Sequence, residues 1–183
     1  MNIIRKRRAK SGVLDVSSKA TQPIPYRVAV SGHRGLGDQA QQERLRSQCR
    51  QLLTEVKARH PDVEALTAIA EGADSLFAET ALELGIPLCV VLPFATYIED
   101  FAEGPARERF LHLQKVAKSV ETLNYVERSD DAYFAGGLWV VDRANLLVAL
   151  WDGQPARGHG GTAEIVNYAR SKNIPVEVLP VKR

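Results

Sequence analysis

Polar residues that could bind a phosphorylated ligand occur in five short stretches, each at or just beyond the end of an apolar segment. Glycine N–H groups, hydroxyl groups and a guanidinium group suit a phosphate, and carboxylates suit ribose hydroxyls or a glycosidic centre. The sequence therefore indicates chemistry on a sugar phosphate. The candidate ligand-binding residues are Ser31, Gly32, His33, Arg34, Glu71, Gly72, Asp74, Pro93, Phe94, Asp152, Gly153, Gly160, Gly161 and Thr162, and Glu164 is the candidate catalytic residue.

The stretch 146–164, LLVALWDGQPARGHGGTAE, carries the strongest of these signals. Residues 146–151 have the aliphatic content of a strand buried on both faces, and the turn residues Asp152 and Gly153 end it. Glycines then precede Thr162 and a helical pattern over 163–171. Glycines that let the backbone approach a ligand, followed by the unpaired N–H groups of a helix start, predict a phosphate-binding loop.

Strand and helix patterns alternate along the rest of the chain. Apolar runs predict strands at 26–31, 66–70, 86–92, 120–126 and 175–179, and helical spacing predicts helices at 39–60, 76–84, 105–119 and 132–144. The alternation predicts an α/β fold: a single Rossmann-like, three-layer domain whose mostly parallel sheet is covered by helices on both faces. In such a sheet the ligand crevice lies at the carboxyl ends of the strands, where the five stretches are expected to meet.

Charge divides the chain into a tail and a domain. Six basic residues and Asp15 give residues 1–25 a net charge of +5, and the remaining 18 basic and 21 acidic residues give −3, within a total of +2. We expect 1–25 to be a disordered basic tail, because a charge run without aromatic residues buries little surface. The alternative is an arm that binds nucleic acid or an anionic surface. Residues 26–183 suffice for one domain.

Several other classes of protein are disfavoured. Cys49 and Cys89 suggest neither a disulfide framework nor a metal pair, which favours a reducing, cytoplasmic location. No apolar run has the length of a membrane span or follows the basic N-terminus as a signal sequence would require. No Cys/His cluster has metal-ligand spacing, and G-x-x-x-x-G-K-S/T and G-x-S-x-G motifs are absent. The turn GHRGLG at 32–37 also lacks the dinucleotide spacing G-x-G-x-x-G.

Each candidate residue also has a purely structural interpretation. The glycines could be ordinary turn residues, His33 a loop histidine whose hydrogen bonds are satisfied within the protein, and Arg34 a surface ion-pair partner. Glu164 stabilises a helix N-terminus by about 0.3–1 kcal/mol without any ligand. Gly136 and Gly137 each cost a helix about 1 kcal/mol relative to alanine, which either close packing or a nearby ligand would offset.

Three segments resemble the SLOG superfamily: SGHR at 31–34, AEGADSLFAETALELGIPLCVVLPF at 70–94, and WDG followed by GHGGTAEIVNYAR at 158–170. This superfamily groups LOG-type ("lysine decarboxylase"-like) phosphoribohydrolases, the DNA-processing protein A fold and nucleotide-sensing domains. The resemblance covers about 26–181 and implies a Rossmann-like nucleotide-binding domain. It places Gly32 at the first phosphate-facing turn, Gly72 and Asp74 at the second, and Gly160, Gly161 and Thr162 at the phosphate loop of the last helix.

The catalytic members of this superfamily carry P-G-G-x-G-T-x-x-E, in which the glutamate assists cleavage of an N-glycosidic bond. This chain reads G-H-G-G-T-A-E, so Glu164 follows Thr162 by two residues instead of three, which turns a helical side chain by about 100°. GTAEIVNYAR is similar to the G-T-x-x-E-x-x-x-A segment of nucleoside 2-deoxyribosyltransferases, with the same displacement. These departures favour binding over catalysis.

The sequence thus supports a nucleotide-binding or sensing module that needs no cofactor and takes a nucleotide or phosphate ligand. The alternative is a nucleotide N-glycosidase, a phosphoribohydrolase or deoxyribosyltransferase-like enzyme, with Glu164 at the sugar centre, Arg34 on the phosphate and Asp74 or Asp152 on the ribose. Binding of single-stranded DNA is a weaker alternative. The mildly acidic core and the lack of clustered basic and aromatic residues disfavour nucleic acid.

Helix 132–144 is the expected interface of a homodimer. Its small residues and Trp139 would suit a helix that flanks the sheet and meets a second copy, and an ordinary core helix is the alternative. No membrane partner is expected. The identity of the base and the number of phosphates are left open by the sequence.

Overall fold

The computed structural model describes residues 24–156 and 158–182. Residues 1–23, nearly all of the predicted basic tail, lie outside the described residues, so that prediction is not tested. In chain order the elements are β1 (Tyr26–Gly32), α1 (Gln39–Arg59), β2 (Val63–Thr67), α2 (Ala73–Glu83), β3 (Leu88–Leu92), the 3₁₀ helix η1 (Tyr97–Asp100), α3 (Pro105–Val116), β4 (Ser119–Thr122), α4 (Asp130–Asp142), β5 (Leu146–Trp151), α5 (Thr162–Ser171) and β6 (Val176–Pro180).

Six strands of the described residues form one sheet in the order β4-β3-β2-β1-β5-β6, and every neighbouring pair is parallel. The predicted α/β fold is confirmed, with a sheet that is parallel throughout. From β1 the chain builds outward to β4 at one edge, then returns to place β5 on the other side of β1. Strand order therefore reverses between β1 and β5, and in open α/β sheets a crevice forms at the carboxyl ends at such a point.

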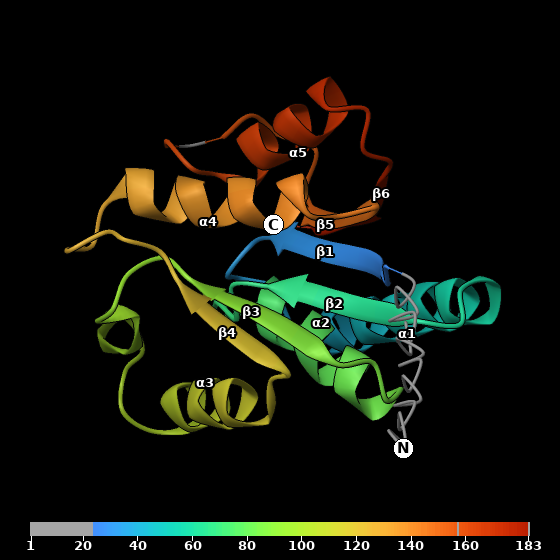
Figure 1. The fold of residues 1–183 in the computed structure, drawn as a ribbon, viewed down its shortest axis with the longest axis horizontal. Helices are drawn as coiled ribbons and strands as arrows, with labels where there is room; N and C mark the ends of the chain where they lie inside the picture. Colours follow the sequence, from blue (N-terminus) through green and yellow to red (C-terminus); the bar gives the residue numbers. More distant parts are fainter. Residues whose placement is uncertain (1–23, 157, 183) are drawn as a thin grey trace, which may run out of the picture.

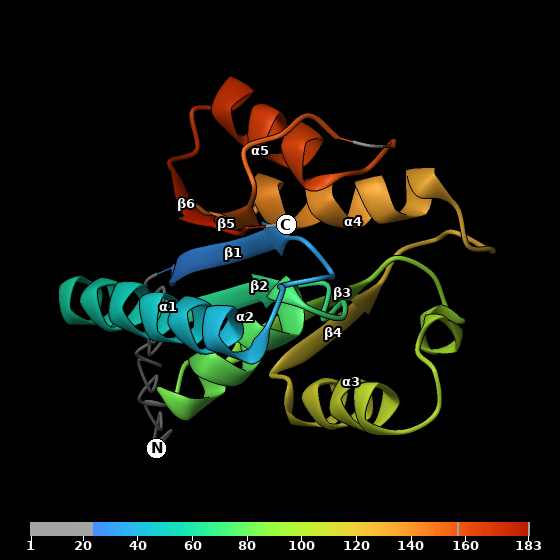
Figure 2. The same ribbon diagram turned by 180° about the vertical axis from the view of Figure 1, so that it is seen from behind.

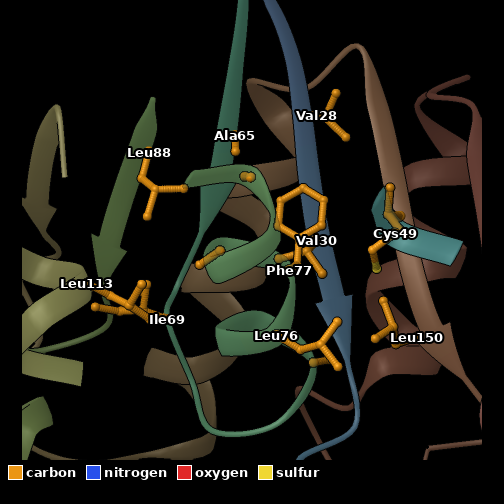
Figure 3. Close-up of a cluster of buried hydrophobic side chains, with 14 of the residues drawn as sticks. Val28, Val30, Cys49, Ala65, Ile69, Leu76, Phe77, Leu88, Leu113 and Leu150 are labelled. Carbon is orange, nitrogen blue, oxygen red and sulfur yellow. The ribbon is translucent and has the colours of Figure 1, made fainter. Parts of the chain in front are cut away.

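Helices cover both faces of the sheet, as predicted. α1, α2 and α3 lie on one face and α4 and α5 on the other (Figure 1), and the view from behind shows the same division (Figure 2). Alternate residues of a strand point to opposite faces. Val28 and Val30 accordingly join the core under α1, α2 and α3, shown in Figure 3, whereas Ala29 joins the core under α4 and α5. Full burial of a side chain such as Phe77 contributes about 1.5–3 kcal/mol.

The second strand lies earlier than predicted, at Val63–Thr67 instead of 66–70. The cause is Glu64, a buried charged residue near the start of β2. Its carboxylate lies 2.9 Å from Arg27 Nε and 2.7 Å from Lys118 Nζ. Burial by itself would raise the pKa of Glu64, but the hydrogen bonds from Lys118 and Arg27 lower it. Ion pairs across the sheet therefore allow an acid where the sequence pattern predicted none.

Other boundaries differ more modestly. The strand predicted at 120–126 is Ser119–Thr122, an edge strand whose residues are all exposed, so no buried alternation marks its end. The loop expected at 95–104 contains η1, in which Tyr97 packs against aromatic rings that include Phe94 and Phe101. α2 and α4 begin two to three residues earlier than expected, at Ala73 and Asp130.

None of the described helices is both long and apolar enough to cross a membrane.

The two glycines of α4 have different surroundings. A Cβ on Gly137 would lie 2.8 Å from Cγ1 of Ile165 in α5 and closer still to its Cδ1, whereas a Cβ on Gly136 would make only an ordinary contact, 3.9 Å from Pro93. Close packing thus explains Gly137 alone. α4 buries one face on the sheet, as a core helix does, and its Trp139 donates a hydrogen bond to Glu121. Its role in a homodimer stays a prediction.

Candidate functional site

A cleft of about 510 Å³ lies at the carboxyl ends of the strands, where β1 ends between β2 and β5. Binding sites for small ligands typically measure about 300–1,000 Å³. The structure brings together residues that the sequence spreads over more than half of the chain. The predicted residues that line the cleft are Ser31, Gly32, His33, Arg34, Asp74, Pro93, Gly160, Gly161 and Thr162.

Some predicted residues lie beside the cleft. Phe94 is buried in an aromatic cluster, because consecutive residues leaving β3 point in different directions and only Pro93 reaches the cleft. Glu71 and Gly72 line a smaller neighbouring pocket of about 150 Å³. Gly153 forms the turn after β5 with a φ of 75°.

The turn that leaves β1 is packed too closely for a side chain at Gly32. A Cβ there would lie 2.5 Å from Cβ of Ala73 and 2.8 Å from the backbone oxygen of Leu150. The His33 N–H donates to that same oxygen at 3.1 Å, and the His33 carbonyl accepts from the N–H of Ala73 at 3.0 Å. The first N–H of α2 is therefore bound by the backbone of the protein itself.

His33 connects the ends of β1 and β5. Its Nε2 lies 3.0 Å from Oδ1 of Asp152 and 3.2 Å from the Asp152 backbone nitrogen, and the two side chains are only 9% and 10% exposed. The imidazole is thus held against the turn after β5. Asp152 does not line the cleft but positions a residue that does.

Helix α5 begins at the cleft with open N–H groups. Its N-cap, Gly161, has no capping side chain, and within the described residues no acceptor meets the N–H groups of Gly161, Thr162 or Ala163. The hydroxyls of Thr162 and Ser31 also line the cleft without a hydrogen-bond partner in the described part of the chain. A helix start with unsatisfied N–H groups and about half a positive charge attracts anions.

Glu164 does not line the cleft. Its Oε2 accepts a hydrogen bond from the N–H of Gly160 at 2.5 Å and lies 3.3 Å from Nδ1 of His159. His159 in turn lies 3.2 Å from Asp131 and packs against the ring of Phe134. Glu164 thus ties the loop before α5 to the first turns of α4. Its catalytic role stays a prediction, and the displaced spacing in the sequence agrees with a position outside the cleft.

Asp74 is a buried carboxylate in the wall of the cleft. It lies in the first turn of α2, is 7% exposed, and accepts hydrogen bonds from Oγ1 of Thr67 at 3.3 Å and from the N–H of Ala68 at 3.1 Å. Burial raises the pKa of Asp74 to about 6, although hydrogen bonds from Ala70, Ala68 and Thr67 and the charge of Arg34 act to lower it. Perturbed carboxyl groups in clefts are candidates for contact with a ligand.

The far end of the cleft is formed by residues that the sequence did not single out, Tyr97, Arg128 and Tyr133. The guanidinium of Arg34 lies 5.5 Å from the centre of the Tyr133 ring, and the Tyr133 hydroxyl donates to Asp100. Asp100 also lies 3.9 Å from Arg34 and 3.6 Å from Arg128. Tyr97 and Tyr133 lie in segments that follow the ends of β3 and β4, so extending the search from strand ends into those segments would have found them.

The lining carries equal numbers of arginine and aspartate side chains: Arg34 and Arg128, and Asp74 and Asp130. His159 and Gly136 also line it and were not predicted as site residues. Among the described residues, no group of three or more His, Cys, Asp or Glu side chains could hold a metal ion.

Solved structures share this fold, although no protein-family model matches the chain and the comparison with curated proteins finds no match. DNA processing protein A from Streptococcus pneumoniae superposes with a TM-score of 0.61 at 13% identity, over 86% of this chain and 51% of that one. The chain thus spans about half the length of the Streptococcus protein.

Two further structures have the same fold. DNA processing protein A from Helicobacter pylori, described for its single-stranded DNA binding mode, gives a TM-score of 0.60 at 16% identity, over 86% of this chain and 66% of that one. The structural-genomics target TM1055 gives 0.52 at 16% identity, over 82% and 72%. Identities this low show the fold alone, and that fold is the one which the SLOG resemblance implied.

Proposed function

We propose that the cleft binds a nucleotide or a nucleotide-derived phosphorylated ligand, with a phosphate at the start of α5. The observation that carries this proposal is the open N–H groups of Gly161, Thr162 and Ala163 beside the hydroxyls of Ser31 and Thr162. Backbone N–H groups at a helix N-terminus and hydroxyl donors together match the oxygens of a phosphate.

The rest of the cleft suits the remainder of a nucleotide. Away from α5 its lining combines apolar groups, among them Pro93 and Val140, with the polar Asp74 and Tyr97. Ligand pockets of this kind bury a flat apolar group and orient it with a few polar side chains. An inorganic anion alone would leave most of the 510 Å³ unfilled.

Single-stranded DNA is the competing ligand, because the Helicobacter protein of the same fold is described as binding it. The balance of two arginines and two aspartates in the lining favours a mononucleotide over a strand, since strand-binding grooves carry an excess of positive charge. Cleavage of the N-glycosidic bond by Glu164 is the enzymatic alternative carried by the sequence, and it is not favoured because that side chain does not line the cleft.

A binding experiment tests the proposal. The protein would be titrated with AMP, GMP, CMP and UMP by calorimetry, with thermal unfolding as a second readout, since a ligand at 100 times its dissociation constant stabilises the native state by about 2.7 kcal/mol. The double variant Ser31→Ala/Thr162→Val should weaken binding about 10- to 100-fold, because each lost hydrogen bond contributes about 0.5–1.5 kcal/mol.

The matched control is Ser47→Ala/Thr54→Val, which makes the same changes on the exposed side of α1 and should leave affinity unchanged. An oligothymidine strand serves as the competing ligand. If none of the four nucleotides binds, or if only the strand binds, the proposed function is rejected.

A further inference from the structure

Tyr97 is a buried residue whose hydroxyl opens into the cleft. The side chain is 1% exposed and packs among Phe94, Phe101 and Phe110, so its ring is fixed. Among the described residues the hydroxyl has no hydrogen-bond partner. Because that part of the chain has no fully buried side-chain oxygen without a partner, the hydroxyl must reach the open space of the cleft that Tyr97 lines. A phenol held there can bind a polar group of a ligand.

Asp74 lines the same cleft as Tyr97. Burial raises the pKa of Tyr97, and the nearby charge of Asp74 raises it further, so the phenol stays protonated and can donate. The Asp74 carboxylate accepts hydrogen bonds from Thr67 and Ala68 at Oδ2 and another from the backbone of Ala70, and an ionised carboxylate has about four acceptor positions. The two side chains therefore present a donor and an acceptor to the same cleft.

The position of this pair in the sheet separates it from the phosphate end. Asp74 follows β2, and the loop before α5 follows β5, with β1 between them. Neighbouring strands are about 4.8 Å apart, so the two ends of the cleft are roughly 10 Å apart. In a nucleotide the ribose lies directly against the phosphate and the base projects beyond it. The spacing thus places the base, and not the ribose, at Asp74 and Tyr97.

We propose that Asp74 and Tyr97 form a nucleobase subsite: the carboxylate accepts an N–H of the base, and the phenol donates to the adjacent ring nitrogen or carbonyl oxygen. The flat surfaces beside them are Pro93 and the Tyr133 ring. This inference rests on the proposed function, because a phosphate at α5 orients the base toward the pair.

The experiment uses the full chain and measures the affinity of the four common nucleoside monophosphates, of ribose 5-phosphate, which has no base, and of purine riboside 5′-monophosphate, whose base has no N–H. The best common nucleotide should bind at least about tenfold more tightly than either of the last two, since a hydrogen bond to a charged group contributes more than a neutral one. Tyr97→Phe should weaken its binding about three- to tenfold and leave ribose 5-phosphate unaffected.

Tyr26→Phe is the matched control, because Tyr26 stacks on His60 at the opposite end of the sheet. Asp74→Asn, which keeps the size of the side chain, should also weaken nucleotide binding without changing that of ribose 5-phosphate. If the nucleotides and ribose 5-phosphate bind equally well, or if Tyr97→Phe weakens both ligands equally, the base subsite is rejected and the phosphate site stands. If neither class of ligand binds, both proposals are rejected.

Discussion

The carboxylate of Glu164 accepts a hydrogen bond from the N–H of Gly160 at 2.5 Å, four residues earlier in the chain. This contact fixes the loop whose next residues, Gly161 and Thr162, begin α5. The acid that sequence motifs assign to bond cleavage thus does not line the cleft itself but binds the backbone of a glycine that does. The role of Glu164 that this position supports first is to hold the loop before α5 in place, and not to attack a sugar.

Replacement of Glu164 separates the two roles. Glu164→Gln keeps a carbonyl oxygen that can accept from Gly160, whereas Glu164→Ala removes it. We expect Glu164→Ala to lower the free energy of unfolding by about 1 kcal/mol and to weaken nucleotide binding, and Glu164→Gln to have less than half of either effect. Urea unfolding and calorimetry measure both. If the native protein releases free base from a nucleotide and Glu164→Gln abolishes that release while binding persists, Glu164 is catalytic.

Gly32 should tolerate no side chain. Gly32→Ala forces a methyl group against Cβ of Ala73 and the backbone of Leu150, neither of which is a flexible chain end, so we expect a loss of about 1–3 kcal/mol in the free energy of unfolding. Gly35→Ala is the matched control, because nothing lies within 4 Å of a Cβ at that position. Equal urea midpoints for the two variants would contradict the packing described at the end of β1.

The two glycines of α4 should respond to alanine in opposite directions. Gly136→Ala gains about 0.5–1 kcal/mol of helix propensity and meets only Pro93, whereas Gly137→Ala presses on Ile165 and should destabilise by about 1–3 kcal/mol. Since Gly136 lines the cleft, the added methyl group should also weaken nucleotide binding while thermal stability rises. A Gly136→Ala protein that is more stable and binds as well as the native one would show that the ligand does not approach α4 there.

Asp74 should make stability depend on pH. Its folded pKa of about 6 exceeds an unfolded value of about 3.9, so the native state retains the proton more strongly, and stability falls as pH rises from about 4 to 6. A shift of about two pKa units corresponds to about 3 kcal/mol. Relative to Asp74→Asn, which does not titrate, the native protein should lose about that much between pH 4 and pH 7 in urea titrations.

The free energy of unfolding of the native protein is compared with that of Asp74→Asn at each pH, because the contributions of all other titrating groups then cancel. Glu64 has a lowered pKa and acts in the opposite sense, since its contribution is present above its unfolded pKa and is lost as pH falls toward the folded value. A difference between native protein and Asp74→Asn that stays constant from pH 4 to pH 7 would rule out the raised pKa of Asp74.

The location of the cleft was predictable because it follows from local patterns. Apolar runs mark the strands, and parallel pairing places all their carboxyl ends at one edge, so Ser31, Asp74 and Thr162 meet without any knowledge of side-chain packing. The orientation of individual side chains was not predictable in this way. Pro93 and Phe94 are neighbours with the same sequence context, yet one reaches the cleft and the other fills the core.

Features that depend on distant partners were missed for the same physical reason. Glu64 belongs to β2 only because Arg27 and Lys118 neutralise it, and these residues lie 37 and 54 positions away. Gly136 and Gly137 look alike in the sequence, and only the position of Ile165 in α5 distinguishes them. Tyr97 lies in η1, a segment that no sequence motif marks, and its ring is fixed by the aromatic cluster around it.

The return of the chain from β4 to β5 places a strand from late in the sequence beside β1, the first strand. The pairing of β5 with β1 joins the two parts of the sheet, α4 and α5 pack across it onto β1, and the cleft lies at the carboxyl ends of these two strands. A ligand bound in the cleft would contact residues that follow β1 and residues that follow β5, and would hold the two strands together. Amide hydrogens of β1 and β5 should then exchange with solvent more slowly when the ligand is bound. Hydrogen exchange in the interior of the sheet would therefore report whether the cleft is occupied.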